Sequence, residues 1–429
     1  MEFLSTRGGD RCAIERALSV GLAADGGLFL PERWPRLDAS DFSDCHTTPG
    51  IAERLLGEFF AGSTFADSFS ELCDQAFTVP TPLHALRDGN THLLELFHGP
   101  SGAFKDVGAN FLATMLAFLN RETDRDTTIL VATSGDTGSA VATAFHRRPG
   151  FKVIILFPDG RVSARQAHLL SCFGDNITSL RVAGSFDDCQ AMAKAALADR
   201  GLVQRLNMTS ANSISLGRLL PQMVYYVESA LSFHRATGES LNFVIPSGNL
   251  GNALACLLAR RIGLPIGSVA ISTNANHVLA DYVRTGIYQP QATRATIANA
   301  MDVGAPSNIE RLIHLARDDQ SLLADLTSEA VGDEAIRSRI QVFHEQFGEI
   351  ICPHTATAAE LLAHRRAEGD IRSFAIVATA HPAKFADVVE PLLGLTVPVP
   401  ESLRPWLERP ASAQRIDVGL DALKAAISY

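Results

Sequence analysis

Residues 128–140, which read TILVATSGDTGSA, place an apolar run rich in β-branched residues before a glycine-containing turn and the start of a helical pattern. Such an apolar run is typical of a strand that is buried on both faces. Glycine beside serine, threonine and aspartate is typical of a tight turn that leads into a helix. This stretch therefore predicts one strand–turn–helix unit of an α/β protein.

The same alternation continues from about residue 90 to about residue 380. The expected strands are 91–97, 128–133, 151–157, 177–182, 241–245, 269–273 and 374–379. The expected helices are 106–120, 140–147, 187–200, 216–234, 251–261 and 355–366. Near-continuous apolar strands that alternate with helices indicate parallel sheets covered on both faces, so we expect an α/β fold with at least two sheets.

The two ends of the chain differ from this middle region. The first 80 residues carry helical patches at 52–60 and 68–77 but little strand signal, and the run Val79-Pro80-Thr81-Pro82 then breaks helix. Four prolines between Pro391 and Pro405 indicate a C-terminal segment that wraps the surface rather than building a new core. We expect divisions of the chain at 1–80, 81–395 and 396–429.

The composition excludes several classes of protein. The 429 residues carry 37 Lys and Arg against 47 Asp and Glu, a net charge of −10, without the basic stripe that nucleic-acid binding needs. No apolar run approaches the ~18 residues of a membrane span, and residues 1–7 lack the basic start and apolar stretch of an export signal. The seven cysteines are scattered, without a Cys-x-x-Cys pair. We therefore expect a cytoplasmic protein without disulfides, nucleic-acid partners or membrane partners.

Several common catalytic motifs are absent from the sequence. It has no phosphate loop ending in Gly-Lys-Ser/Thr, no Gly-x-Gly-x-x-Gly and no Gly-x-Ser-x-Gly. His344-Glu345 resembles the start of a zinc-protease helix, but Gly348 stands where the second histidine is needed. The thirteen histidines show no metal-ligand spacing. A nucleotide hydrolase, a simple dehydrogenase and a metal hydrolase are all disfavoured, and we expect no metal.

Three strand-to-helix turns carry residues that could perform chemistry. The first, HGPSGAFKD at 98–106, places Lys105 at the expected start of a helix. The positive end of the helix dipole, together with partial burial, lowers the pKa of an amine and so favours Schiff-base chemistry. A surface lysine that happens to begin a helix is the alternative.

The second turn, at 133–140, and the third, IPSGNLGN at 245–252, both expose backbone N–H groups at a helix start, which suits a carboxylate or a phosphate. Each could instead be an ordinary capped turn without a ligand. A lysine that can form an imine, a phosphate site and a carboxylate site are together the parts of a pyridoxal phosphate enzyme that acts on an amino acid. Their occurrence in one chain favours that interpretation.

The motifs as a set resemble those of threonine synthases, which are fold-type II pyridoxal phosphate enzymes. The resemblance covers essentially the whole chain, and the further blocks that carry it lie at 5–8, 21–29, 210–213 with Arg218, 298–303 and 378–385. It implies two sheet-containing α/β domains around a central cofactor cleft, preceded by a mostly helical N-terminal segment. Within the catalytic region 81–395, it implies a small subdomain at about 106–225 and a large subdomain formed by the flanking segments.

The resemblance also implies residue roles for the cofactor, pyridoxal 5'-phosphate. Lys105 corresponds to the lysine that holds the cofactor as an imine and later shuttles protons. Thr379 corresponds to the hydroxyl that hydrogen-bonds the pyridine nitrogen. The residues that correspond to the cofactor-phosphate loop are Gly248, Asn249, Leu250, Gly251 and Asn252.

For the substrate, the resemblance implies two groups of residues. Those that receive the α-carboxylate are Ser134, Gly135, Asp136 and Thr137. Those expected at the leaving phosphate are Asn212, Ser213 and Arg218, and arginine suits a bidentate phosphate contact. His354, His381 and Lys384 lie in family-like blocks, but packing or capping explains them equally well, so they are not assigned to the site.

The implied function is that of a carbon–oxygen lyase that converts O-phospho-L-homoserine and water to L-threonine and phosphate, the last step of threonine biosynthesis. Three positions depart from the family pattern, which usually has a larger residue at Gly102, Phe at Leu250 and Asp at Asn252. Because Gly102 would add room or flexibility beside the pocket, a related pyridoxal phosphate lyase or synthase for another amino acid stays open. A non-catalytic paralogue is a further alternative. The expected partner is a small-molecule substrate, and the chain is expected to be a monomer or a homodimer.

Overall fold

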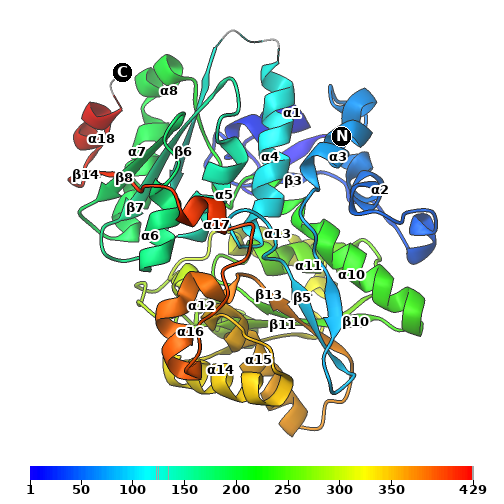
Figure 1. The fold of residues 1–429 in the computed structure, drawn as a ribbon. Helices are drawn as coiled ribbons and strands as arrows, with labels where there is room; N and C mark the ends of the chain where they lie inside the picture. Colours follow the sequence, from blue (N-terminus) through cyan, green and yellow to red (C-terminus); the bar gives the residue numbers. More distant parts are fainter. Residues whose placement is uncertain (122, 124, 134, 428–429) are drawn as a thin grey trace.

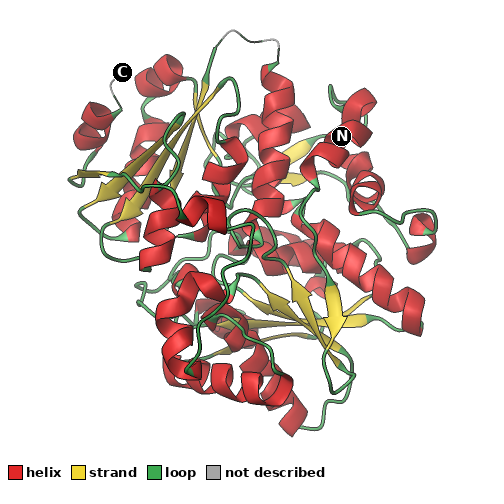
Figure 2. Ribbon diagram, in the orientation of Figure 1, coloured by secondary structure: helices red, strands yellow, loops and turns green. Residues whose placement is uncertain are grey.

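The computed structural model describes residues 1–121, 123, 125–133 and 135–427, and the strands of this described part form three sheets (Figures 1 and 2). The largest has six strands in the order β12-β11-β10-β13-β5-β4. Its strands are β4 (Leu83–Ala85), β5 (Thr91–Glu95), β10 (Leu241–Pro246), β11 (Ile266–Thr273), β12 (Leu326–Ala330) and β13 (Phe374–Ala378). All neighbouring pairs are parallel except β4 with β5, so the carboxyl ends of β10, β13 and β5 lie side by side at one edge.

The second sheet has five parallel strands in the order β14-β8-β7-β6-β9. Its strands are β6 (Thr127–Ala132), β7 (Phe151–Pro158), β8 (Ile177–Val182), β9 (Met208–Ser210) and β14 (Gln414–Ile416). It occupies the upper part of Figure 1, and the six-stranded sheet occupies the lower part. Two sheets whose strands are parallel, apart from the edge strand β4, confirm the α/β fold class expected from the sequence.

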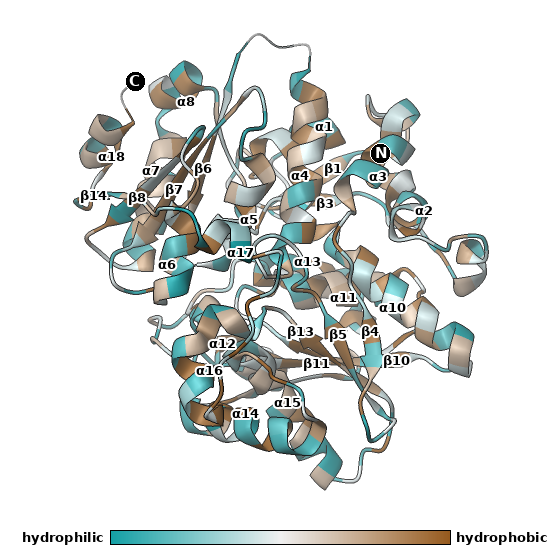
Figure 3. Cartoon of the chain, viewed as in Figure 1, coloured by the Kyte–Doolittle hydropathy of each residue, from teal (hydrophilic) through white to brown (hydrophobic). Residues whose placement is uncertain are grey.

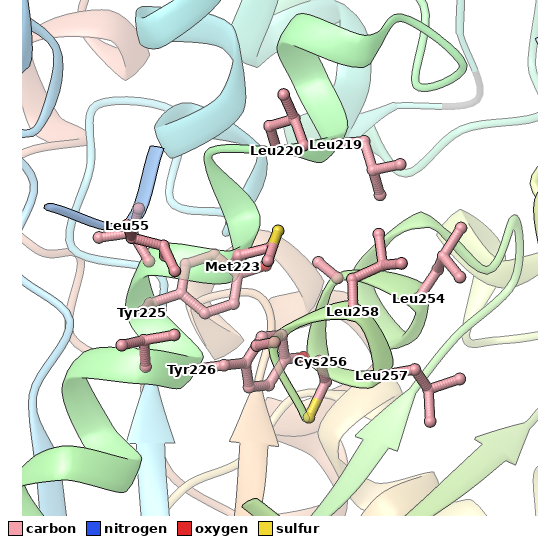
Figure 4. Packing of buried hydrophobic residues seen from close by; sticks show 14 of the residues in the cluster. Leu55, Leu219, Leu220, Met223, Tyr225, Tyr226, Leu254, Cys256, Leu257 and Leu258 are labelled. Carbon is pink, nitrogen blue, oxygen red and sulfur yellow. The ribbon is translucent and has the colours of Figure 1, made fainter. Parts of the chain in front are cut away.

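Helices cover both faces of the six-stranded sheet and of the five-stranded sheet. Alternate residues of β10 show this for the larger sheet, because Phe243 packs into a cluster with helices α10 and α11, whereas Val244 packs into a cluster with α14 and α15. Figure 4 shows the first of these clusters, in which Met223 of α10 lies on the side of Leu258 of α11, and Tyr226 of α10 lies beside Cys256 of α11. In Figure 3 the strands are mostly brown, as expected for strands buried on both faces. The helices of this region are α10 (Gln222–Thr237), α11 (Gly251–Arg261), α12 (Val278–Thr285), α13 (Ile309–Asp318), α14 (Asp333–Phe347), α15 (Pro353–Ala367) and α16 (Ala386–Leu393).

The five-stranded sheet is covered in the same way. Ile129 and Val131 of β6 pack with α4, α5 and α6, and Leu130 of the same strand packs with α7 and α18 on the other face. The helices are α4 (Lys105–Asn120), α5 (Asp136–Phe145), α6 (Ala164–Ser171), α7 (Phe186–Ala198), α8 (Arg200–Leu206), α9 (Leu216–Leu219) and α18 (Leu420–Ala426). In the described part of the chain, no helix is both long and apolar enough to cross a membrane.

The two ends of the chain hold strands that the sequence did not indicate. Three short antiparallel strands, β1 (Phe3–Ser5), β2 (Arg11–Cys12) and β3 (Phe29–Pro31), form the third sheet beside helices α1 (Ile14–Val20), α2 (Thr48–Phe60) and α3 (Phe69–Ala76). Runs of two or three residues are too short to show a period-2 pattern. At the other end, β14 adds a strand beside β8, and the short helix α17 (Arg404–Leu407) contacts α6.

Several helices differ from their expected bounds, and the helix expected at 140–147, for example, is α5 and begins at Asp136. The helix expected at 216–234 is divided into α9 and α10, because Pro221 between them has no N–H to continue the hydrogen-bond ladder. The helix expected at 187–200 ends at Ala198, and α8 then follows with Asp199 as its N-cap. The proposed divisions at 1–80, 81–395 and 396–429 stay predictions.

Candidate active site

The candidate site lies where three adjacent strands of the six-stranded sheet end. The loop after β10 carries residues 247–250, the loop after β13 carries Thr379, and the loop after β5 leads to Lys105. Because ligands of open α/β sheets bind at the carboxyl ends of the strands, this edge is the expected place for a site. The start of α5, which follows β6 of the five-stranded sheet, reaches the same region, since the Asp136 carboxylate lies 3.8 Å from the Lys105 amine.

Lys105 is the first residue of α4, as the sequence predicts. The segment before it is held against the loop after β13, because the amide of Phe104 donates to the carbonyl of Thr379 over 2.9 Å. The amide of His381 in turn donates to the carbonyl of Gly102 over 2.9 Å. Gly102 has φ +64°, a left-handed conformation that glycine adopts without strain. This pairing fixes Lys105 beside Thr379.

The Lys105 amine has little contact with solvent, since its side chain is only 14% exposed. Burial lowers the pKa of Lys105 to about 8, and the carboxylate of Asp136 opposes this shift. Lys384 and Arg218 add to the lowering because they are positive charges nearby. The centroid of the Phe104 ring also lies 4.6 Å from the amine. Such an amine can exchange its proton near neutral pH, as Schiff-base chemistry requires.

The loop after β10 can approach a ligand with its backbone. A Cβ on Gly248 would lie 2.7 Å from the Cα of Met301, so only glycine fits there. Leu250 adopts φ +66° and is the N-cap of α11, which begins at Gly251 and runs for 11 residues. The first N–H groups of such a helix have no intrahelical partner and attract anions.

Asn252 lies on the first turn of α11, and its side chain binds residues of α10. Its side-chain oxygen accepts hydrogen bonds from the hydroxyls of Tyr225, at 2.5 Å, and Tyr226, at 2.8 Å. Its side-chain nitrogen is buried and has no partner in the described part of the chain. Sequence reasoning did not predict the two tyrosines, because their contact with Asn252 is tertiary.

Two predicted groups of residues meet at Asn249. Its side-chain nitrogen donates to the hydroxyl of Ser213 over 2.6 Å, and its side-chain oxygen accepts from the amide of Ser307. Asn308 donates to the carbonyls of both Asn249 and Ser213. The expected cofactor loop and the expected phosphate-binding segment are therefore in direct contact.

Arg218 is buried on α9, with 2% exposure. Its Nη1 donates to the carbonyl of Ala211 over 2.7 Å, whereas its Nε has no partner in the described part of the chain. Burial lowers the pKa of Arg218 to about 10, opposed by Asp106. Asn212 lies in the loop before α9, and its side-chain oxygen likewise has no described partner. Arg311 is a contrast, because all three of its guanidinium nitrogens donate to the protein.

The turn before α5 is partly capped by the protein itself. Gly135 adopts φ +143°, and the hydroxyl of Thr133 accepts from the amides of Gly135, at 3.0 Å, and Gly138, at 2.9 Å. The amides of Asp136 and Thr137 are thus the first of the helix that could reach an anion. Ser134, which was predicted for the same turn, lies outside the described residues.

The carboxylate of Asp136 is engaged by two lysines. Lys384 Nζ lies 2.6 Å from Oδ1, with side-chain exposures of 1% and 3%, and Lys105 Nζ lies 3.8 Å from Oδ2. Burial acts to raise the pKa of Asp136, but Lys384 and Lys105 together hold it well below its usual range. Its carboxylate is therefore ionised and cannot itself attract a substrate carboxylate. From the sequence alone, packing or capping explains Lys384 equally well, although its place in the 378–385 block is a usable signal for the site.

His354 and Thr379 complete the cluster. His354 Nε2 accepts from the amide of Ala300 over 3.1 Å, and burial lowers the pKa of His354 to about 4, so this imidazole is neutral. Thr379 is 6% exposed, and its hydroxyl makes no hydrogen bond with any described residue. In the described part of the chain, no group of three or more His, Cys, Asp or Glu side chains could hold a metal ion.

Unpartnered buried polar atoms test whether these residues fit pyridoxal phosphate. Six such atoms belong to residues of the blocks that form the site, namely Ser101, Asp106, Asn212, Ser215, Arg218 and Asn252. Buried polar atoms without a partner are rare in native structures and point to a missing polar ligand. Four of the six can donate, namely the hydroxyls of Ser101 and Ser215, the Nε of Arg218 and the Nδ2 of Asn252. Together with the backbone of the loop at 247–250 and the Lys105 amine, these donors fit a phosphate-bearing cofactor that is attached to a lysine.

Three family models match overlapping parts of the chain, which together span residues 2–427. Residues 2–77 match the model described as threonine synthase N terminus, and residues 355–427 match threonine synthase, C-terminal. Residues 76–381 match the model described as pyridoxal-phosphate dependent enzyme.

Full-length relatives agree with these matches. The threonine synthase of Haemophilus influenzae is 36% identical over 418 residues, which are 97% of this chain and 96% of the relative. The crystal structure of threonine synthase from Escherichia coli superposes with a TM-score of 0.92 and 34% identity, covering 100% of this chain and 99% of the other. The PLP-bound threonine synthase of Brucella melitensis gives a TM-score of 0.90 and 31% identity, covering 99% and 98%. The chain therefore belongs to the threonine synthase family of pyridoxal-phosphate-dependent enzymes.

Proposed function

We propose that this chain converts O-phospho-L-homoserine and water to L-threonine and phosphate, with pyridoxal phosphate attached to Lys105. Family membership supports the reaction. The observation that carries the site assignment is the placement of the Lys105 amine, which lies beside Thr379 and faces the start of α5. When bound, pyridoxal phosphate supplies an electron sink that stabilises negative charge on the substrate carbons nearest the amino group.

For the cofactor, the chain offers a phosphate site and a ring contact. The backbone of Gly248, Leu250 and Gly251 binds the phosphate at the start of α11, and Asn249 and Asn252 hold that loop through their side-chain contacts. The hydroxyl of Thr379, which has no described protein partner, hydrogen-bonds the ring nitrogen. A neutral hydroxyl does not hold that nitrogen protonated, so the electron sink is a moderate one.

For the substrate, the two ends bind to segments that follow β6 and β9, two adjacent strands of the five-stranded sheet. The α-carboxylate binds at the start of α5, through the backbone amides of Asp136 and Thr137, with Ser134 and Gly135 in the same turn. The phosphate binds near Arg218, Asn212 and Ser213, where the Nε of Arg218, a hydrogen-bond donor, is buried without a partner among the described residues. Binding at both ends orients the reacting carbons toward Lys105, and positioning of this kind contributes strongly to rate.

Lys105 moves protons in this proposal. Its amine removes the proton from the substrate Cα and carries protons at Cβ, where water finally adds. Because burial lowers the pKa of Lys105 to about 8, both the protonated and the neutral amine are populated near neutral pH. Positioned proton transfer of this kind typically contributes ~10²–10⁴-fold to rate.

The departure at Gly102 bears on the choice of substrate. The side chain of Leu403, from the C-terminal segment, would lie 2.9 Å from a Cβ at position 102 and is itself buried. The room expected from the glycine is therefore filled by Leu403. This supports the family substrate over an enlarged pocket that would suit another amino acid.

A substrate panel with phosphate readout tests the proposal. Purified full-length protein with pyridoxal phosphate should release phosphate from O-phospho-L-homoserine and form threonine in equal amount. O-acetylserine, serine and threonine, tested under the same conditions, should react far more slowly. Faster turnover of one of these three would replace the proposed reaction with that of a related lyase, and a colourless protein that binds no cofactor would indicate a non-catalytic paralogue.

The proposal also covers the cellular compartment and the oligomeric state of the enzyme. We expect the enzyme in the cytoplasm, which the seven free cysteines, all within the described residues, support. We expect a monomer or a homodimer, which light scattering on the purified protein measures.

A further inference from the structure

Two of the five lysines of this chain meet in one buried cluster. The five are Lys105, Lys152, Lys194, Lys384 and Lys424. Lys384 is 1% exposed, and its ammonium lies 2.6 Å from the Asp136 carboxylate and donates to the carbonyl of Ser101 over 2.8 Å. A charge taken out of water needs close partners to offset its loss of hydration, and these two contacts provide them.

The start of α6, a helix that packs on the five-stranded sheet, binds the backbone around Lys384. The hydroxyl of Ser163, at the start of α6, donates to the carbonyl of Lys384 over 3.2 Å, and Arg165 donates to the carbonyl of Ala383. The side chain then reaches α5 and the loop before α4. Lys384 therefore links the turn after β13, the start of α5 and the segment that leads to Lys105.

The carboxylate of Asp136 lies near two ammonium groups, those of Lys384 and Lys105. The distance to Lys384 is 2.6 Å and the distance to Lys105 is 3.8 Å, so the nearer lysine has the stronger Coulomb attraction. The other charged groups that act on Lys105 are Asp106 and Arg218, while the neighbouring His354 is neutral. Without Lys384, the carboxylate of Asp136 would be left with Lys105 as its remaining ammonium partner among these groups.

We propose that Lys384 is a positioning residue, whose ammonium binds the carboxylate of Asp136 and the carbonyl of Ser101 and so keeps Asp136 from holding the proton of Lys105. Lys384 also fixes the start of α5 against the loop before Lys105. The inference rests on the proposed role of Lys105 as the cofactor-binding amine, but not on the identity of the substrate.

The test measures the proton affinity of Lys105 directly. Full-length protein without cofactor, labelled with ¹³C at the lysine Cε, gives five signals. The signal that is missing in Lys105→Arg belongs to Lys105. In Lys384→Met the titration midpoint of Lys105 should rise by about one pH unit, a tenfold gain in proton affinity, because a positive neighbour is lost and Asp136 becomes free to pair. In Asp136→Asn the midpoint should fall, because the attracting carboxylate is lost. Lys384→Arg should stay near the wild-type midpoint.

Lys424→Met is the matched control, because Lys424 forms an ion pair of the same 2.6 Å length with Asp199 at the surface. It should leave the Lys105 midpoint unchanged. A folded Lys384→Met with an unshifted midpoint would overturn the proposal. Should Lys384→Met fail to fold, an unshifted midpoint in Asp136→Asn overturns it instead.

A second readout uses the protein with its cofactor. The pH midpoint of the visible absorbance of the Lys105-bound cofactor should rise in Lys384→Met and fall in Asp136→Asn. A purely structural role for Lys384 would lower the melting temperature without moving this midpoint, and that result would also overturn the proposal. These measurements use no substrate. Their outcome is therefore independent of whether the substrate panel supports the proposed reaction.

Discussion

The amide of Phe104 donates a 2.9 Å hydrogen bond to the carbonyl of Thr379. The bond joins the residue before Lys105 to the residue proposed to contact the cofactor ring, although the two lie at opposite ends of the catalytic region. It uses only the backbone of Thr379, so the hydroxyl remains without a partner among the described residues. A substitution can therefore remove the hydroxyl of Thr379 and keep the backbone hydrogen bond that positions this residue.

Thr379→Val keeps the shape and the backbone bond but removes the hydroxyl. We expect the protein to fold, to bind pyridoxal phosphate with a changed visible spectrum, and to turn over more slowly, because the ring nitrogen loses its hydrogen bond. Thr357→Val is the control, since that hydroxyl is already bonded within the core to the carbonyl of His354. It should lower the melting temperature and leave the spectrum alone. Wild-type turnover in Thr379→Val would exclude the ring contact.

Gly248→Ala tests the close approach of the loop after β10. The new Cβ would lie 2.7 Å from the Cα of Met301, which belongs to the backbone and cannot swing away. The loop must shift, and we expect cofactor affinity, measured by fluorescence or absorbance titration, to fall at least tenfold. Gly57→Ala on α2 is the control, because its Cβ meets nothing within 4 Å, and alanine favours a helix by up to ~1 kcal/mol. It should leave cofactor affinity unchanged.

Local chemistry explains which parts of the fold the sequence predicts. The strand expected at 177–182 is β8, and the helix expected at 251–261 is α11, with the same bounds. The strand β14 has only three residues, and it exists because β8 offers an edge to pair with, which no local pattern reveals.

The same distinction holds in the site. Glycines and hydroxyl residues mark the turns that carry Lys105 and Gly248, because a tight turn at a helix start requires them. The pairing of Lys384 with Asp136 and the two tyrosine hydroxyls on Asn252 depend on how distant segments pack. Sequence reasoning could therefore name the loops but not the side chains that hold them.

Leu403→Ala tests whether the C-terminal segment shapes the pocket beside Gly102. The side chain is buried, so its removal should lower the free energy of unfolding by about 2–5 kcal/mol, measured by denaturant unfolding. It also reopens the space that Leu403 fills next to Gly102. We expect the preference for O-phospho-L-homoserine over bulkier analogues to decrease. An unchanged preference would mean that this space lies outside the substrate site.

Arg218→Ala should weaken substrate binding while leaving the cofactor in place. A hydrogen bond to a charged group contributes roughly 1.5–3 kcal/mol, so kcat/KM should fall about ten- to a hundredfold. Steady-state kinetics give this value, and the visible absorbance reports the cofactor. Arg311→Ala is the contrast, since the protein already binds all three of its guanidinium nitrogens, and its main effect should be on stability. Near-wild-type kinetics in Arg218→Ala would remove Arg218 from the site.

Lys105 carries the assignment on which the other roles depend. Lys105→Ala removes both the attachment point and the proton carrier, and Lys105→Arg keeps a positive charge that can neither form an imine nor act as a base near neutrality. Both variants should lose the absorbance of the lysine-bound cofactor and nearly all turnover. Because burial lowers the pKa of Lys105 to about 8, and the neutral amine is the nucleophile, cofactor attachment to the wild-type protein should speed up as the pH rises through that value. Borohydride reduction followed by peptide mapping should find the cofactor on Lys105 alone among the five lysines. Finding it on Lys384, whose ammonium is bound to Asp136, would contradict the site described for this chain.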